Sequence, residues 1–195
     1  MNPTEIKTWR SAERARLIAL RMALPPAMRR AAGERIAATL HEIVAPRPGV
    51  LGIYWPFRAE FDPRPLVERL TAAGRRVALP VVVDKRGPLE YRAWMPGENL
   101  VAGVWDIPIP ESRVVVRPSM VLAPLVGFDR ACYRLGYGGG YFDRTLGSLD
   151  PRPLAIGVGF AVQRIETIHP QPFDIAMDLI VTESGLVNPR SLAGA

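Results

Sequence analysis

A glycine-rich segment at residues 134–144 carries the residue types best suited to chemistry in this chain. It reads Arg-Leu-Gly-Tyr-Gly-Gly-Gly-Tyr-Phe-Asp-Arg, with an arginine at each end. Glycines let the backbone approach a ligand closely, and a run of exposed N–H groups binds anions, especially ahead of a helix. Arginine side chains match phosphate oxygens in bidentate fashion. The segment therefore predicts a phosphate-binding loop with tyrosine rings for stacking, in which Asp143 could orient a cation.

The segment fits neither of the common phosphate motifs. A dinucleotide fingerprint needs glycine at 136, 138 and 141, but residue 141 is tyrosine, and the Gly-Lys-Ser/Thr of a P-loop is absent. A tight turn without a ligand is the alternative interpretation. The preceding residues favour a binding loop, because 120–128 is an apolar run of buried-strand type and 139–149 can form a helix. Ligands bind at such strand–loop–helix junctions in open α/β sheets.

Two carboxylates, Glu60 and Asp62, follow the strand predicted at residues 50–54. Side chains at the end of such a strand are placed to contact ligands. Trp55 would supply an apolar wall beside them. The alternative is a solvated turn ahead of Pro63.

Three arginines lie on one line of the helix predicted at residues 4–24. At 100° per residue, Arg10, Arg14 and Arg21 fall within roughly 40° of one another. The buried stripe that we expect beside this line consists of Trp9, Ala12, Leu17, Leu20 and Leu24. The net charge of +6 favours anionic partners such as nucleotides, polyglutamate tails or nucleic acid. A solvated basic helix face would explain the same arginines.

Hydrophobic periodicity predicts alternating helices and strands. We expect helices over residues 4–24, 27–44, 65–73 and 139–149. We expect strands over residues 50–54, 76–80, 89–94, 119–127, 154–160 and 179–182, and irregular structure over 95–118. This alternation predicts an α/β fold of three layers, a mainly parallel (mixed) sheet with helices on both faces, similar to a Rossmann fold.

The composition is that of a single globular domain, residues 1–195. Hydrophobic residues make up 48% and charged residues 23%, and no low-complexity linker divides the chain. The longest apolar run is too short to span a bilayer, and no secretory signal is evident. A single cysteine, Cys132, excludes an internal disulfide framework and fits a reducing cytoplasm. Two histidines are too few for a histidine metal site.

Residues 122–144 resemble the signature of the 5-formyltetrahydrofolate cyclo-ligases, also called methenyltetrahydrofolate synthetases. The resemblance rests on an apolar strand with a proline, then Phe128-Asp129, then the glycine-rich segment. It covers nearly the whole chain. Residues 54–63 look like the family's substrate segment, residues 74–80 like its second strand, and Gln163 with residues 172–174 and 178–183 like its closing segment.

The resemblance implies a monomeric, ATP- and Mg2+-dependent ligase that converts 5-formyltetrahydrofolate, with or without a polyglutamate tail, to 5,10-methenyltetrahydrofolate. It implies catalytic roles for Arg134, Tyr141 and Asp143, and magnesium binding by Asp143 with Asp174. The residues implied to bind the nucleotide are Arg10, Arg14, Arg134, Leu135, Gly136, Tyr137, Gly138, Gly139, Gly140, Tyr141 and Phe142. Those implied to bind the folate are Trp55, Glu60, Tyr137, Gly138, Gly139, Gly140 and Tyr141. Glu60 suits a pterin because a carboxylate accepts two parallel N–H donors.

Some residues depart from the family pattern. Arg10 replaces a usual lysine, Cys132 a usual glycine and Gln171 a usual glutamate, and residues 109–112 differ from the usual Glu-Pro. Because these departures cluster near nucleotide positions, a folate- or nucleotide-binding protein without turnover is a second interpretation. A basic nucleic-acid-binding module is a third, which would explain the arginines but not Glu60 or the glycines. For Asp143, a role in the first turn of a helix is the alternative.

Overall fold

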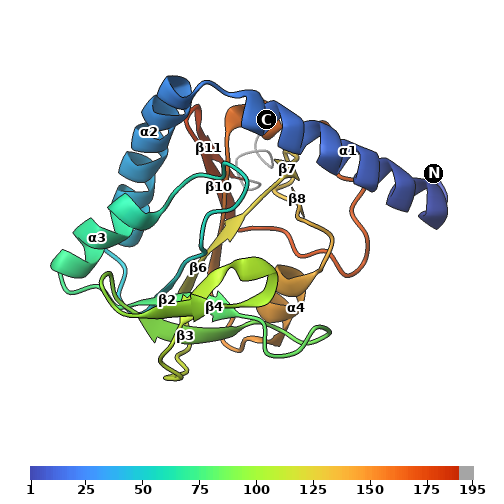
Figure 1. Cartoon of the computed structure of the whole chain (residues 1–195). Helices are drawn as coiled ribbons and strands as arrows, with labels where there is room; N and C mark the ends of the chain where they lie inside the picture. Colours follow the sequence, from blue (N-terminus) through green and yellow to red (C-terminus); the bar gives the residue numbers. More distant parts are fainter. Residues whose placement is uncertain (189–195) are drawn as a thin grey trace.

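A seven-stranded mixed sheet forms the centre of the computed structural model, which describes residues 1–188 (Figure 1). Its strands are β1 (Leu51–Gly52), β2 (Val77–Val81), β3 (Glu90–Trp94), β6 (Met120–Pro124), β9 (Leu154–Val158), β10 (Leu179–Thr182) and β11 (Gly185–Val187). They lie in the order β11-β10-β9-β6-β1-β2-β3. The five inner strands are parallel, and β3 and β11 pair antiparallel at the two edges.

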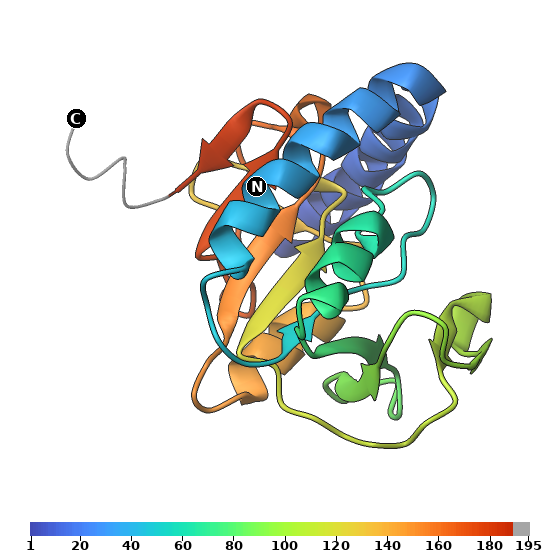
Figure 2. The ribbon, with the colours of Figure 1, turned by 90° about the vertical axis from the view of Figure 1, so that its left-hand side faces the viewer.

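The central strand β6 is buried on both faces of the sheet. Val121, Leu122 and Ala123 have no exposed surface, as expected for a parallel strand with layers on both sides. On one face lie α2 (Pro26–Val44) and α3 (Arg64–Ala72) (Figure 2). Their Ile36, Leu40, Leu66 and other apolar side chains pack against the sheet. On the other face, Leu146 of α4 (Tyr141–Ser148) packs against the sheet. The three-layer α/β fold predicted from the sequence is confirmed.

Helix α1 (Pro3–Ala23) lies over the carboxyl end of β6, with Arg21 contacting the residue after that strand's end (Figure 1). Its amino end is closed by a capping box between Asn2 and Glu5. The buried stripe predicted for this helix was wrong. Ala12 and Leu20 are exposed, Trp9 and Leu24 are half-buried, and only Leu17 of the five is fully buried.

The inward face of α1 is the arginine line itself. Arg10 and Arg21 are buried beside Leu17, and Arg14 is half-buried. The physical reason lies in what α1 covers: loops with unpaired backbone carbonyls rather than an apolar sheet face. Guanidinium groups can satisfy such carbonyls, whereas leucine side chains cannot.

Several element boundaries differ from those expected. The strand expected at 119–127 is divided, because β6 ends at Pro124 and β7 (Gly127–Phe128) pairs with β8 (Arg134–Leu135) in a separate hairpin. Residues 95–118 contain the short strands β4 (Leu100–Ala102) and β5 (Pro108–Pro110) around a 3-10 turn, η1 (Val104–Asp106). A second such turn, η2 (Ala161–Gln163), follows β9. No helix within residues 1–188 is long and apolar enough to cross a membrane.

Candidate active site

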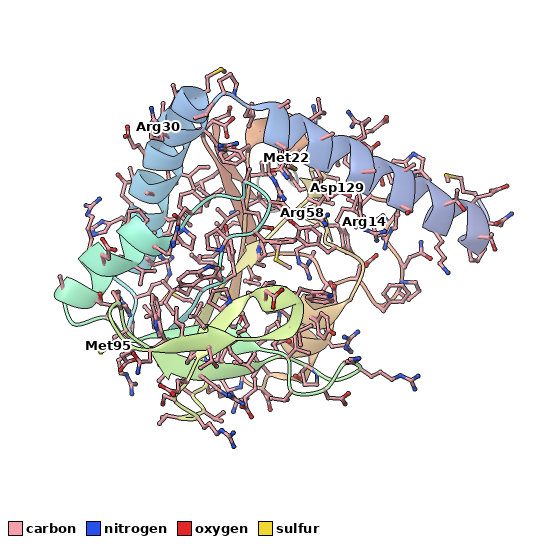
Figure 3. The ribbon with its side chains drawn as sticks, viewed as in Figure 1. Arg14, Met22, Arg30, Arg58, Met95 and Asp129 are labelled. Carbon is pink, nitrogen blue, oxygen red and sulfur yellow. The ribbon has the colours of Figure 1, made fainter. Side chains whose placement is uncertain are left out.

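A cavity of about 740 Å3 lies at the carboxyl ends of the parallel strands. The residues predicted to bind nucleotide, folate or magnesium all line it, although they come from α1, the segment after β1, the glycine-rich segment and the segment before Ile175. Asp62, the second carboxylate predicted after β1, does not line it. In Figure 3, Arg14 and Arg58 lie beneath α1, on the side that faces the rest of the molecule. The topology thus brings four distant parts of the chain to one place, and the role of each residue there stays a prediction.

The glycine loop, residues 136–140, joins β8 to α4 and needs glycine for two reasons. Gly138 and Gly140 adopt left-handed backbone conformations, with φ of +95° and +65°. A Cβ at Gly139 would also stand only 2.8 Å from the Tyr141 ring, so this position leaves no room for a side chain. Arg14 packs against the loop, and its Nε donates to the Gly136 carbonyl at 2.8 Å. Arg14 of α1 therefore helps to hold the conformation of the loop and places its guanidinium next to the loop amides.

Arg134 and Asp143 form a buried ion pair at the two ends of this loop. Arg134 Nη2 donates to Asp143 Oδ2 at 3.0 Å, and Asp143 Oδ1 accepts from the Ile175 amide at 3.1 Å. The Arg134 guanidinium also stacks on Phe142, 5.1 Å from the ring centre. Burial lowers the pKa of Arg134, while Asp143 opposes the shift. Arg134 Nε is buried without a hydrogen-bond partner in the described part of the chain, so one donor remains for a ligand.

A second ion pair joins Arg10 to Asp174. Arg10 donates to the carbonyls of Ile168 at 2.9 Å and His169 at 3.0 Å, and its guanidinium contacts both Asp174 oxygens. Asp174 also accepts from the Gln171 amide at 2.6 Å. The Gln171 side chain, which replaces the usual glutamate, turns back to the His169 and Pro170 carbonyls. The guanidinium of Arg10 thus makes its hydrogen bonds to other residues of the protein.

The two aspartates are compatible with magnesium held jointly with a nucleotide. Asp143 and Asp174 are brought together because Ile175, whose amide binds Asp143, directly follows Asp174. Within residues 1–188 no group of three or more histidine, cysteine or acidic side chains could hold an ion by itself. Magnesium commonly takes one or two carboxylates together with phosphate oxygens and water. Both Asp143 oxygens and Asp174 Oδ1 accept one hydrogen bond each and keep acceptor capacity, whereas Asp174 Oδ2 accepts two.

Glu60 is a buried carboxylate that lines the same cavity, only 8% exposed. Its Oε2 accepts from the Phe57 amide at 2.9 Å and its Oε1 from the Tyr137 hydroxyl at 3.0 Å. Burial raises the pKa of Glu60 to about 7, opposed by Arg21, the Phe57 amide and Tyr137. For Glu60 the solvated turn considered as the alternative is therefore wrong, whereas Asp62 is partly exposed and pairs with Arg64 at the surface.

Aromatic rings form the remaining walls, and some were not predicted. Trp55 is half-buried, with Trp94 edge-on at 6.0 Å and the Arg64 guanidinium 4.9 Å from its ring. Trp105 in η1 was missed: it is 64% exposed at the cavity and lies edge-on to Tyr141 at 6.1 Å. It falls in a stretch with prolines and glycines and without periodicity, so only its large aromatic ring in an irregular segment could have identified it.

Other parts of the signature support the loop instead of lining it. Asp129 Oδ1 accepts from the amides of Ala131 and Tyr133, at 3.0 and 3.1 Å, which closes the turn between β7 and β8. Cys132, where the family usually has glycine, has a φ of +63° and is fully buried. Burial raises the pKa of its thiol to about 11, so the group stays protonated and is no nucleophile at neutral pH. Leu135 is buried in an apolar cluster and also borders the cavity.

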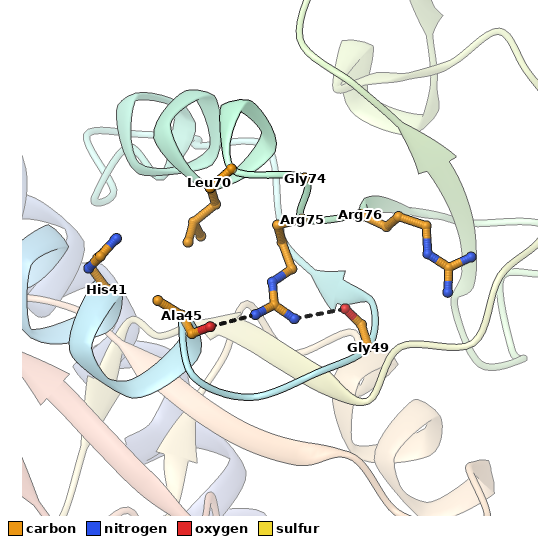
Figure 4. A pocket seen from close by; sticks show the side chains of 8 residues that line it. His41, Ala45, Gly49, Leu70, Gly74, Arg75 and Arg76 are labelled. Atoms are coloured by element: carbon orange, nitrogen blue, oxygen red, sulfur yellow. Dashed lines mark hydrogen bonds between the residues drawn. The ribbon is translucent and has the colours of Figure 1, made fainter.

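A smaller cavity of about 310 Å3 lies at the opposite, amino ends of β1 and β2 (Figure 4). Arg75 crosses it and donates to the carbonyls of Val44, Ala45 and Gly49, each at 3.0 Å. These acceptors include the last carbonyls of α2, so Arg75 closes the carboxyl end of that helix. This guanidinium is used by the fold, and we assign the cavity no ligand.

The chain matches known proteins over most of its length. A model of the 5-formyltetrahydrofolate cyclo-ligase family matches residues 6–183. The chain is 33% identical over 141 residues to a 5-formyltetrahydrofolate cyclo-ligase of Escherichia coli (strain K12), which covers 69% of this chain and 78% of the relative. It is 29% identical over 186 residues to the corresponding protein of Mycolicibacterium smegmatis, covering 91% and 95%.

A solved structure gives the same result. The NMR structure of the 5,10-methenyltetrahydrofolate synthetase of Aquifex aeolicus superimposes with a TM-score of 0.81, at 26% identity, over 93% of each chain. The sequence match, the shared fold and the cavity agree: the chain belongs to the 5-formyltetrahydrofolate cyclo-ligase family.

Proposed function

We propose that this protein catalyses the ATP-dependent cyclisation of 5-formyltetrahydrofolate to 5,10-methenyltetrahydrofolate, with release of ADP and phosphate. One observation carries the proposal beyond family membership. A single cavity is lined both by a buried carboxylate and by an arginine-flanked glycine loop. The first suits the N–H donors of a pterin and the second suits a triphosphate, so the two substrates would meet between them.

The chemical problem is that a formamide oxygen is a poor leaving group. Transfer of the γ-phosphoryl group to the formyl oxygen forms an imidate phosphate. N10 of the folate then attacks the formyl carbon, the C–O bond breaks, phosphate leaves and the N10 proton is released. Such a reaction depends on positioning and on charge neutralisation rather than on a protein nucleophile. The protonated Cys132 is consistent with that requirement.

The nucleotide side of the cavity is assigned to the glycine loop and its arginines. The amides of residues 136–140 would hold phosphate oxygens, and Arg14 already lies against the loop. Arg134 would donate its unpaired Nε to the transferring phosphoryl group. Tyr141 follows the loop directly and would separate the nucleotide from the folate, with its ring held by Trp105 and by Arg144 at 5.0 Å.

The folate side of the cavity is assigned to Glu60, Trp55 and Tyr137. The Glu60 carboxylate would accept two parallel N–H donors of the pterin, and Trp55 would pack against the ring. Tyr137 belongs to both sides, because its hydroxyl binds Glu60 while its backbone is part of the loop. The loop would thus link the two binding events.

Magnesium is part of the proposal, with Asp143 and Asp174 as its ligands. When bound, the ion supplies charge neutralisation on the phosphate oxygens. Asp143 and Asp174 now neutralise Arg134 and Arg10, so these pairs would have to rearrange as the nucleotide binds.

The remaining parts of the proposal concern the protein as a whole. Members of this family are ligases that use a nucleotide and a small-molecule substrate. We propose that residues 1–195 form one domain that acts as a monomer in the cytoplasm, and that it accepts polyglutamylated folate through its positive charge.

Absorbance spectroscopy tests the proposed reaction directly. Purified protein with 5-formyltetrahydrofolate, ATP and Mg2+ should produce the absorbance of methenyltetrahydrofolate, and a reaction without ATP should not. Binding of folate without product or ADP on long incubation would contradict the enzyme and leave a binding protein. Salt-dependent binding of nucleic acid in place of folate would contradict both.

A further inference from the structure

Arg21 is a fully buried arginine, 1% exposed, on the inward face of α1. Its Nε donates to the Arg58 carbonyl at 3.0 Å, its Nη1 to the Leu125 carbonyl at 3.1 Å and its Nη2 to the Tyr137 hydroxyl at 2.6 Å. Nη1 also lies 3.8 Å from Glu60 Oε1. Within the described chain Arg21 is not among the side chains that line the large cavity, so any effect on a ligand passes through other residues.

The three acceptors belong to three different segments around the cavity. Arg58 lies in the segment after β1, Leu125 directly after β6, and Tyr137 in the glycine loop. A planar guanidinium with five N–H donors can hold all three in one geometry, which a lysine cannot. Burying such a group is unfavourable unless its hydrogen bonds are made, so its retention in the core requires this set of partners.

The segment after β1 is also strained where Arg21 holds it. Arg58 and Ala59 have φ values of +46° and +59°, in the left-handed region that non-glycine residues seldom adopt. This turn places Glu60 inside the cavity, with its carboxylate bonded to the Phe57 amide. The Arg21 bond to the Arg58 carbonyl thus supports the backbone conformation that buries Glu60.

We propose that Arg21 is a positioning residue for the folate side of the cavity, which fixes the Tyr137 hydroxyl and keeps the buried Glu60 carboxylate negatively charged for pterin donors. The inference rests on the proposed function. The groups that face Glu60 are Arg21 from α1, Tyr137 from the glycine loop and Tyr54 from the segment after β1, and Arg21 is the cation among them. Burial raises the pKa of Glu60, and Arg21 is the largest influence that lowers it.

Three variants separate the charge of Arg21 from its geometry. Arg21→Met removes the charge, Arg21→Lys keeps the charge but not the planar fork, and Arg16→Met is the matched control. Arg16 lies on the exposed face of the same helix, paired with Glu13. Titration calorimetry with 5-formyltetrahydrofolate from pH 6 to pH 9 gives the dissociation constant and the pH midpoint of binding for each protein.

The midpoint for wild type should lie near pH 7, the pKa of Glu60. Arg21→Met should raise it by a unit or more, which reduces ionised Glu60 at pH 7 from about half to about a tenth and weakens binding about fivefold, with recovery towards pH 9. Arg21→Lys should keep the midpoint but bind more weakly at every pH. Arg16→Met should match wild type. A uniform loss of affinity in Arg21→Met, with an unchanged midpoint, would show a merely structural role and overturn the proposal.

Two further measurements keep the result decisive. If Arg21→Met does not fold, as judged by circular dichroism, Tyr137→Phe removes only the hydroxyl that joins Arg21 to Glu60. Its midpoint should also rise, and an unchanged midpoint would overturn the proposal. The 13C carboxyl signal of Glu60, followed by NMR without ligand, reports the same midpoint directly. If wild type does not bind folate, the proposed function is refuted. The NMR measurement still tests Arg21 in that case. A raised Glu60 midpoint in Arg21→Met would support the role of Arg21, and an unchanged midpoint would refute it.

Discussion

The burial of Glu60 should make this protein less stable at neutral pH than at mildly acidic pH. The pKa of Glu60 is about 7 in the folded chain and 4.5 for an ordinary exposed glutamate. Below pH 4.5 the carboxyl group is neutral in both states and contributes nothing. Between pH 4.5 and 7 the unfolded chain ionises first, so stability falls as the pH rises, and above pH 7 the full cost remains.

The size of this effect follows from the shift. At about 1.4 kcal/mol per pKa unit the total cost is roughly 3–4 kcal/mol, of which roughly 2–3 kcal/mol develops between pH 5 and pH 8. Glu60→Gln keeps the shape and removes the titration. The variant should therefore gain roughly 2–3 kcal/mol of stability relative to wild type when the pH is raised from 5 to 8.

Urea denaturation followed by tryptophan fluorescence, at pH 5 and pH 8 without ligand, measures this difference. Glu68→Gln is the matched control, because Glu68 is exposed on α3, and its difference from wild type should change by under about 0.5 kcal/mol. If the difference for Glu60→Gln is the same at both pH values, Glu60 titrates as an exposed group and the reasoning from burial is wrong. The same variant should bind folate more weakly, because a carboxamide offers only one acceptor oxygen.

Three further predictions concern the nucleotide side. Arg134→Ala should weaken ATP binding about 10- to 100-fold and folate binding much less, since a charge-assisted hydrogen bond contributes about 1.5–3 kcal/mol; equal ATP affinity in a calorimetric titration would exclude Arg134 from the site. Asp143→Asn should lower turnover about 100-fold or more while folate still binds, and Asp174→Asn should lower turnover by a smaller factor. If Asp143→Asn shows normal turnover and an unchanged magnesium optimum, Asp143 serves only the first turn of the helix. Gly138→Ala should weaken ATP binding and lower the free energy of unfolding by about 1–2 kcal/mol. Gly97 has the same φ of +95° with nothing within 4 Å of an added Cβ, so Gly97→Ala should lower stability by a similar amount without affecting ATP binding. Equal ATP affinities of the two variants would contradict the role of the loop.

Much of the fold and of the candidate site follows from local pattern. The predicted elements are present because their periodicity and their glycine and proline breaks are local properties, as in α2, where Ile36, Leu40 and Val44 are buried as expected. The glycine loop was predicted from residue types alone, since left-handed φ values at Gly138 and Gly140 require glycine. Short strands such as β11 were missed, because three residues carry little periodicity and depend on pairing with β10.

Which face of α1 is buried was decided by the tertiary structure alone. The sequence determined the helix, its cap and its line of arginines. Whether its apolar or its basic face is buried depends on the chemistry of the surface that the helix covers. That surface consists of loop carbonyls from residues 58, 125, 136 and 168, so arginines pack inward and Ala12 and Leu20 face solvent. The same holds for Glu60: its residue type and its place after β1 are in the sequence, whereas its pKa depends on burial and on Arg21, 39 positions away. Desolvation and charge pairing are properties of the space around a side chain, and only the fold creates that space.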